Sequence, residues 1–93
     1  MSILKKRVTV LGSTGSVGGN TLDVLARHPD RFEVFALTAS TQVDLIVQQC
    51  LLFTPVFAVM GSDAHGQALE GRLLDVGCKT RVLWGAAAIE MVA

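Results

Sequence analysis

The chain has 93 residues, a formal net charge of zero and a hydrophobic fraction of 51%. This length allows one small domain with a modest core, and a balanced charge gives no indication of nucleic-acid binding. No apolar run reaches the roughly 18 residues that a membrane span requires. The basic residues 1–7 precede an apolar run that ends at once in glycines, which does not fit a signal peptide.

The most informative stretch is residues 7–18, where a strand pattern changes into a helical pattern across three glycines. The apolar residues of 7–11 predict a strand, and Gly12, Gly15 and Gly18 follow at a spacing of three. Strand, glycine turn and helix are how a dinucleotide-binding βαβ unit begins. Gly12 permits a sharp turn, Gly15 lets a pyrophosphate approach the backbone, and Gly18 allows the helix to pack closely on the strand.

The start of the following helix is a candidate site for an anion. Its first N–H groups have no intrahelical partner and carry a partial positive charge. The hydroxyl groups of Ser13, Thr14 and Ser16 lie around the same point of the sequence. Two other interpretations are a tight turn without a ligand and a Walker A loop. The Walker A loop is excluded because no Gly-Lys-Ser/Thr sequence follows.

The rest of the chain continues the alternation of helices and strands. Apolar residues at helical spacing predict helices, and short apolar runs between turn residues predict strands. Cys50 falls on an apolar helix face, and neither it nor Cys78 has a neighbouring metal ligand, so we expect two reduced thiols. The predicted elements are helices over 16–27, 42–53 and 64–76, strands over 31–38, 56–60 and 80–84, and a last apolar segment over 86–93.

This order predicts an α/β fold. We expect a Rossmann-like, doubly wound parallel sheet with helices on both faces, incomplete at about four strands and four helices. Lys79 and Arg81 favour an outer position for the fourth strand, beyond the third. The first strand would then keep an unpaired edge, which favours self-association or low stability of the chain.

The loop after the second strand indicates which dinucleotide binds. An acidic residue there binds the ribose 2′-hydroxyl of NAD and repels the 2′-phosphate of NADP. The chain has Thr38, Ser40, Thr41 and Gln42 here, and no carboxylate before Asp44. Polar donors without a carboxylate favour NADP. The loop contains no Arg or Lys, and the alternative interpretation is a polar turn without a ligand.

The glycine stretch carries a resemblance to a known family. Residues 11–18 (LGSTGSVG), followed by 21–24 (TLDV), are similar to the start of 1-deoxy-D-xylulose 5-phosphate reductoisomerases. The continuation into 21–24 makes the resemblance specific, since other glycine-rich NADP domains lack it. Later segments agree and extend the resemblance over nearly the whole chain, at residues 32–37, 49–50, 53–60 and 81–85.

The resemblance implies an activity for the full-length protein. Members of this family convert 1-deoxy-D-xylulose 5-phosphate to 2-C-methyl-D-erythritol 4-phosphate in non-mevalonate isoprenoid biosynthesis. They rearrange the carbon skeleton and reduce an aldehyde with NADPH, using a divalent metal ion, magnesium or manganese. We therefore expect a cytoplasmic NADPH-dependent oxidoreductase that is a homodimer when intact.

The resemblance also assigns cofactor contacts. Residues 14–17 would contact the NADPH phosphates, and the loop at 40–42 replaces a sequence that is commonly Gly-Lys-Asn in the family, which removes a positive charge. Together with the glycine pattern, this gives the candidate cofactor-binding residues Gly12, Ser13, Thr14, Gly15, Ser16, Val17, Gly18, Ser40, Thr41 and Gln42.

The length of the chain implies an N-terminal portion of the NADPH-binding domain, residues 1–93. The family's metal-binding carboxylates and substrate-phosphate groups belong to a catalytic domain beyond these residues. The Asp and Glu residues present here are scattered, so we assign no catalytic and no metal-binding residue. We expect this portion to be inactive alone.

Two other functions remain open at this point. The first is the NADP-binding domain of another oxidoreductase, of the semialdehyde dehydrogenase or extended short-chain reductase type. Such enzymes carry a catalytic Cys or a Tyr-x-x-x-Lys pair, and this chain has no tyrosine. The second is a non-catalytic nucleotide-sensing domain. The apolar segment 86–93 argues against it, because a natural terminus rarely falls within such a pattern.

Overall fold

A computed structural model describes residues 5–93; residues 1–4, part of the basic N-terminal segment, lie outside the described residues. Strands and helices alternate throughout, and every boundary lies within one residue of the sequence-based prediction. The elements are β1 (Lys6–Val10), α1 (Ser16–Ala26), β2 (Phe32–Ala39), α2 (Val43–Phe53), β3 (Phe57–Met60), α3 (Asp63–Asp75), β4 (Arg81–Trp84) and α4 (Ala86–Val92).

The four strands form one parallel sheet in the order β1-β2-β3-β4. This confirms the predicted α/β class and the outer position of the fourth strand. Because each crossover connects neighbouring strands in the same direction, right-handed connections place the intervening helices on one face. Among the described residues, the second edge of β1 has no paired strand.

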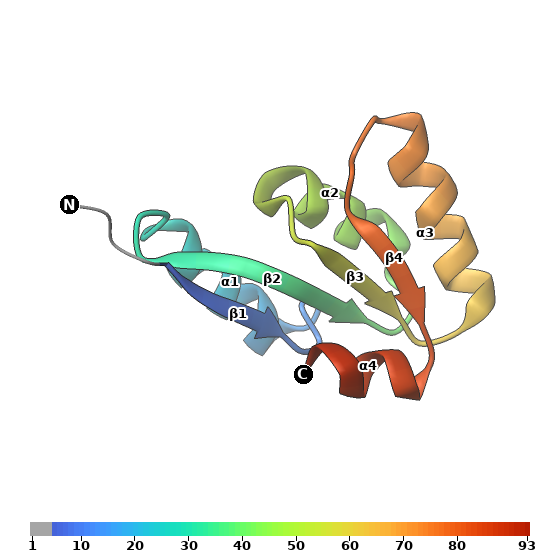
Figure 1. Ribbon diagram of the computed structural model, residues 1–93, viewed down its shortest axis with the longest axis horizontal. Coiled ribbons are helices and arrows are strands. Elements are labelled where there is room, and N and C mark those ends of the chain that lie inside the picture. Colours follow the sequence, from blue (N-terminus) through green and yellow to red (C-terminus); the bar gives the residue numbers. More distant parts are fainter. Residues whose placement is uncertain (1–4) are drawn as a thin grey trace.

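The helices cover both faces of the sheet, as predicted (Figure 1). The three crossover helices α1, α2 and α3 contribute Leu22, Ile46 and Leu69 to one large core. The helix α4 packs on the other face, where Val92 joins a smaller cluster with Ala36. Figure 1 shows α4 running across the ends of the strands toward β1, and the Thr9 hydroxyl donates a hydrogen bond of 2.6 Å to the Val92 carbonyl.

One close contact in α3 was not visible in the helical pattern. A Cβ atom at Gly66 would come within 2.3 Å of the Trp84 ring, so a glycine is required where β4 passes α3. The buried residues of α3 are Gly66, Leu69 and Leu73.

The two cysteines lie where the second and third helices approach the fourth strand. Cys50 is fully buried in the main core, as expected. The Cys78 thiol donates a weak hydrogen bond of 3.9 Å to the Cys50 carbonyl. Burial raises the pKa of the Cys50 thiol to about 12, with a smaller contribution from Cys78. Both thiols are free.

No helix within residues 5–93 has the length and hydropathy needed to cross a membrane.

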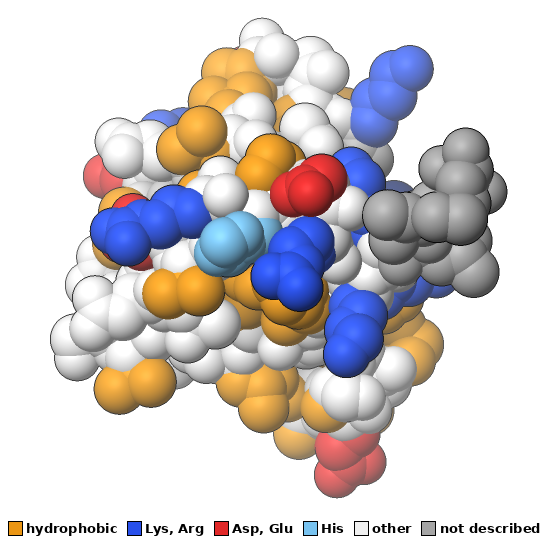
Figure 2. Space-filling model, turned by 90° about the vertical axis from the view of Figure 1, so that its left-hand side faces the viewer, with side chains coloured by type: hydrophobic (Ala, Val, Ile, Leu, Met, Phe, Trp, Pro, Cys, Tyr) orange, Lys and Arg blue, Asp and Glu red, His pale blue; other side chains and the backbone are white. Residues whose placement is uncertain are grey.

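Basic side chains gather at the end of the molecule where the strands begin. Figure 2 views this end and shows Lys and Arg side chains spread across it. Lys5 precedes β1, Arg31 precedes β2 and Lys79 lies before β4, all of them exposed. The carboxyl ends of the strands, where the candidate residues lie, are at the opposite end, so these cations do not contribute locally to an anion site there.

Candidate functional site

The glycine turn joins the carboxyl end of β1 to the start of α1. Gly12 has a φ of +64°, in the left-handed region that favours glycine, and its carbonyl accepts a 3.0 Å hydrogen bond from the Gly15 N–H. A Cβ atom at Gly18 would lie 2.2 Å from the Gly12 carbonyl oxygen. The first turn of α1 therefore packs directly on the backbone of the glycine turn, as the sequence predicts for this spacing.

The open groups of the site are the first N–H groups of α1. The N-cap residue is Gly15, which has no side chain to cap them, and the first turn contains no acidic residue. Within the described residues, no hydrogen bond is donated by the N–H groups of Ser16, Val17 or Gly18. A helix end of this kind binds anions through both N–H donors and the helix dipole.

Most candidate side chains of the turn border this helix end. Ser16 and Val17 are exposed, and Thr14 is half-buried. Gly15 is exposed, and a Cβ atom there would meet only the Gly12 carbonyl oxygen, at 3.4 Å. The backbone at Gly15 is therefore open to a ligand in the way that a pyrophosphate requires.

Ser13 lies differently from the other candidates. Its side chain is fully buried, and its hydroxyl donates a 2.7 Å hydrogen bond to Oε1 of Gln49 on α2. The Gln49 Nε2 donates in return to the Ser13 carbonyl at 2.9 Å. Ser13 thus anchors the glycine turn to α2, and its hydroxyl does not face the open helix end.

The end of β2 also supports the turn. The Gly12 N–H donates to Thr38 Oγ1 at 2.9 Å, and the Ser13 N–H donates to the Thr38 carbonyl at 2.8 Å. From the sequence, Gln49 entered only as part of the resemblance at residues 49–50, and Thr38 only as the residue where the second strand meets its loop. Neither observation indicated that the Gln49 side chain would reach the glycine turn.

The loop of residues 40–42 begins two residues beyond Thr38, so the sheet brings it to the same end of the molecule as the glycine turn. Ser40, Thr41 and Gln42 are all exposed. The Ser40 carbonyl accepts a 3.3 Å hydrogen bond from the Gly61 N–H, which ties the loop to the end of β3. Gln42 is the N-cap of α2, and its side chain makes no capping hydrogen bond.

The first carboxylate after this loop in the sequence is Asp44, in the first turn of α2. It forms an exposed ion pair with Arg72 of α3. Arg72 therefore offsets a negative charge that would otherwise oppose a phosphate at residues 40–42. Because the pair is exposed, solvent screens most of its contribution to stability.

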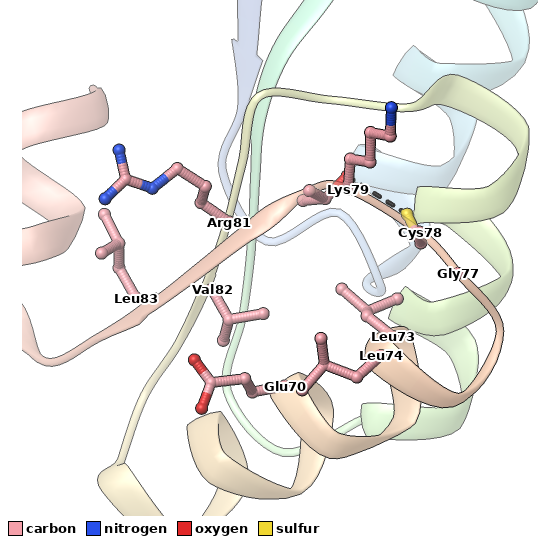
Figure 3. Close-up of a pocket in the computed structure, with 10 residues that line it drawn as sticks. Glu70, Leu73, Leu74, Gly77, Cys78, Lys79, Arg81, Val82 and Leu83 are labelled. Carbon is pink, nitrogen blue, oxygen red and sulfur yellow. Dashed lines mark hydrogen bonds between the residues drawn. The ribbon is translucent and has the colours of Figure 1, made fainter.

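A cavity elsewhere in the fold does not involve the candidate residues. It has a volume of about 570 Å³ and lies between α3 and β4 (Figure 3). Its lining includes Glu70, Leu73 and Leu74 of α3 and Arg81 and Val82 of β4. Within residues 5–93, no group of three or more His, Cys, Asp or Glu side chains has an arrangement that could hold a metal ion.

A parallel sheet, a glycine turn after β1 and an open helix end define the Rossmann-like class of nucleotide-binding domains. The chain belongs, within this class, to the 1-deoxy-D-xylulose 5-phosphate reductoisomerase family, whose model matches residues 8–93. A reductoisomerase of this name from Aromatoleum aromaticum is 56% identical over 88 residues, and one from Burkholderia vietnamiensis is 52% identical over 86 residues. These alignments cover 95% and 92% of this chain.

Solved structures give the same result. A crystal structure of DOX-P reductoisomerase in complex with magnesium superposes with a TM-score of 0.90 at 28% identity, over 96% of this chain and 22% of that one. The Zymomonas mobilis 1-deoxy-D-xylulose 5-phosphate reductoisomerase in complex with NADPH has a TM-score of 0.84 at 34% identity, over 91% of this chain and 22% of that one. This chain spans about 22% of the length of the curated relatives named above.

Proposed function

We propose that this chain is the N-terminal NADPH-binding portion, residues 1–93, of a 1-deoxy-D-xylulose 5-phosphate reductoisomerase. The observation that carries the proposal is the uncapped start of α1 beside Gly15, in a family with a relative solved in complex with NADPH. The NADPH pyrophosphate lies against the N–H groups of Ser16, Val17 and Gly18. The 2′-phosphate lies at residues 40–42. The family match does not favour another oxidoreductase or a nucleotide-sensing domain.

The longer protein would be cytoplasmic and homodimeric, and would convert 1-deoxy-D-xylulose 5-phosphate to 2-C-methyl-D-erythritol 4-phosphate in the non-mevalonate route to isoprenoids. The divalent metal ion and the sugar phosphate would be held by its catalytic domain, outside residues 1–93. A relative solved with magnesium supports the metal requirement. The residues described here supply cofactor binding only, so this chain is inactive by itself.

The first expected result is a preference for NADPH over NADH. Residues 40–42 offer hydroxyl, amide and N–H donors to a 2′-phosphate, and Arg72 offsets the Asp44 carboxylate. We expect NADPH to bind roughly three- to tenfold more tightly than NADH, a modest factor because the loop contains no cation. Parallel titrations by calorimetry measure both dissociation constants. Equal or tighter binding of NADH would refute the assignment of the 2′-phosphate to this loop.

The free edge of β1 leads to a second expected result. The described residues pair only one edge of this parallel strand, and unpaired strand edges are templates for association with another chain. The 93-residue chain should therefore self-associate in solution. Size-exclusion chromatography coupled to light scattering measures the molar mass. A monodisperse monomer that unfolds cooperatively would contradict this expectation.

A further inference from the structure

The contact between Gln49 and Ser13 uses both ends of the Gln49 amide group. Nε2 donates to the Ser13 carbonyl at 2.9 Å, and Oε1 accepts from the Ser13 hydroxyl at 2.7 Å. Ser13 is fully buried and Gln49 is half-buried. The two residues are 36 positions apart, so this contact joins α2 to the glycine turn. Within residues 5–93, the other hydrogen bonds that tie the turn to a neighbouring element are those to Thr38 on β2.

These bonds fix one side of the glycine turn and leave the other side free. The N–H groups of Gly12 and Ser13 are held by Thr38, and the carbonyl and hydroxyl of Ser13 are held by Gln49. The backbone that follows begins α1, and its N–H groups at residues 16–18 donate no hydrogen bond within residues 5–93. Donors that are fixed before a ligand arrives bind it without a further ordering cost.

Gln49 also connects the two halves of the proposed cofactor site. It lies on α2, which begins directly after the loop at 40–42. The Gln49 side chain therefore holds the turn that faces the pyrophosphate. The loop that faces the 2′-phosphate is attached to the N-terminus of the same helix. The spacing from Val43 to Gln49 is roughly 9 Å along the helix axis.

We infer that Gln49 is a positioning residue for the cofactor, which it does not touch. It holds Ser13, and through Ser13 it sets the spacing between the pyrophosphate-binding turn and the 2′-phosphate loop. The inference rests on the proposed function for the identity of the ligand, and on the hydrogen bonds alone for the rigidity of the turn.

The test measures NADPH binding to Gln49→Met and to Gln48→Met by calorimetry, with the same fraction of each variant folded. Methionine keeps the length and volume of Gln49 and removes both hydrogen bonds, while Gln48 is its exposed neighbour on α2. We expect Gln49→Met to weaken NADPH binding roughly tenfold. Adenosine 2′-monophosphate lacks the pyrophosphate. Its dissociation constant for Gln49→Met should lie within twofold of its value for the wild type. Ser13→Ala, which removes one of the two bonds, should have an intermediate effect on NADPH.

A second readout needs no ligand. Amide hydrogen exchange measured by NMR should be at least fivefold faster at Gly12 and Ser13 in Gln49→Met than in Gln48→Met. Unchanged exchange at these two amides, or equal weakening of NADPH and adenosine 2′-monophosphate, would overturn the inference. If the wild-type chain binds no NADPH, the proposed function fails, and the exchange rates still decide whether Gln49 holds the turn.

Discussion

Replacing Gly15 by valine is expected to weaken NADPH binding severely while the fold is retained. Gly15 has φ −81° and ψ 171°, a conformation that any residue adopts, and a Cβ atom there contacts only the Gly12 carbonyl, at 3.4 Å. The valine methyl groups would instead occupy the space against the helix end that the pyrophosphate requires. We expect affinity to fall roughly a hundredfold or more, which is about 2.7 kcal/mol of binding free energy.

The measurement is a calorimetric titration with NADPH, accompanied by urea unfolding. Since the substituted residue is only an N-cap, the free energy of unfolding should change by no more than about 1 kcal/mol. Gly15→Ala, with a smaller side chain, should lose less affinity than Gly15→Val. If Gly15→Val bound NADPH with wild-type affinity, the glycine turn would not be part of the cofactor site.

Replacing Gly18 by alanine is expected to produce the largest loss of stability. The added Cβ would lie 2.2 Å from the Gly12 oxygen and 2.8 Å from the Ser13 Cα. These are backbone atoms, which cannot rotate away, so α1 must shift off the turn. We expect a loss of about 3 kcal/mol in the free energy of unfolding, measured by urea denaturation.

The neighbouring Gly19 is a matched control. It is in the same helix, and a Cβ atom there meets nothing within 4 Å. Gly19→Ala should therefore stabilise the chain by about 0.5–1 kcal/mol through the higher helix propensity of alanine. The two variants should thus move stability in opposite directions. If Gly18→Ala were as stable as Gly19→Ala, the inference that α1 packs closely on the turn at Gly18 would be contradicted.

The elements of the fold could be predicted from sequence because their signals are local. Pro29, Pro55 and the glycines mark the ends of helices and strands, and apolar spacing distinguishes the helices from the short strands. The outer position of β4 followed from Lys79 and Arg81, which suit an edge strand. The resemblance to the family added the cofactor and the activity that local patterns do not specify.

The contacts that hold the site could not be predicted in the same way. Thr38 and Gln49 reach the glycine turn from 26 and 36 residues away, and no spacing rule in the sequence joins them. The same is true of Trp84 against Gly66 and of Arg72 beside Asp44. The direction of the Ser13 side chain depends on the partner that α2 presents, so sequence reasoning placed its hydroxyl with those of Thr14 and Ser16.

The position of the nucleotide on the glycine turn is tested most directly by the NMR amide spectrum of the ¹⁵N-labelled chain during an NADPH titration. We expect the largest shifts at the N–H groups of Ser16, Val17 and Gly18, with a second group at residues 40–42. Residues around the cavity between α3 and β4 should not shift. Shifts confined to that cavity, or no shifts at saturating NADPH, would contradict the account.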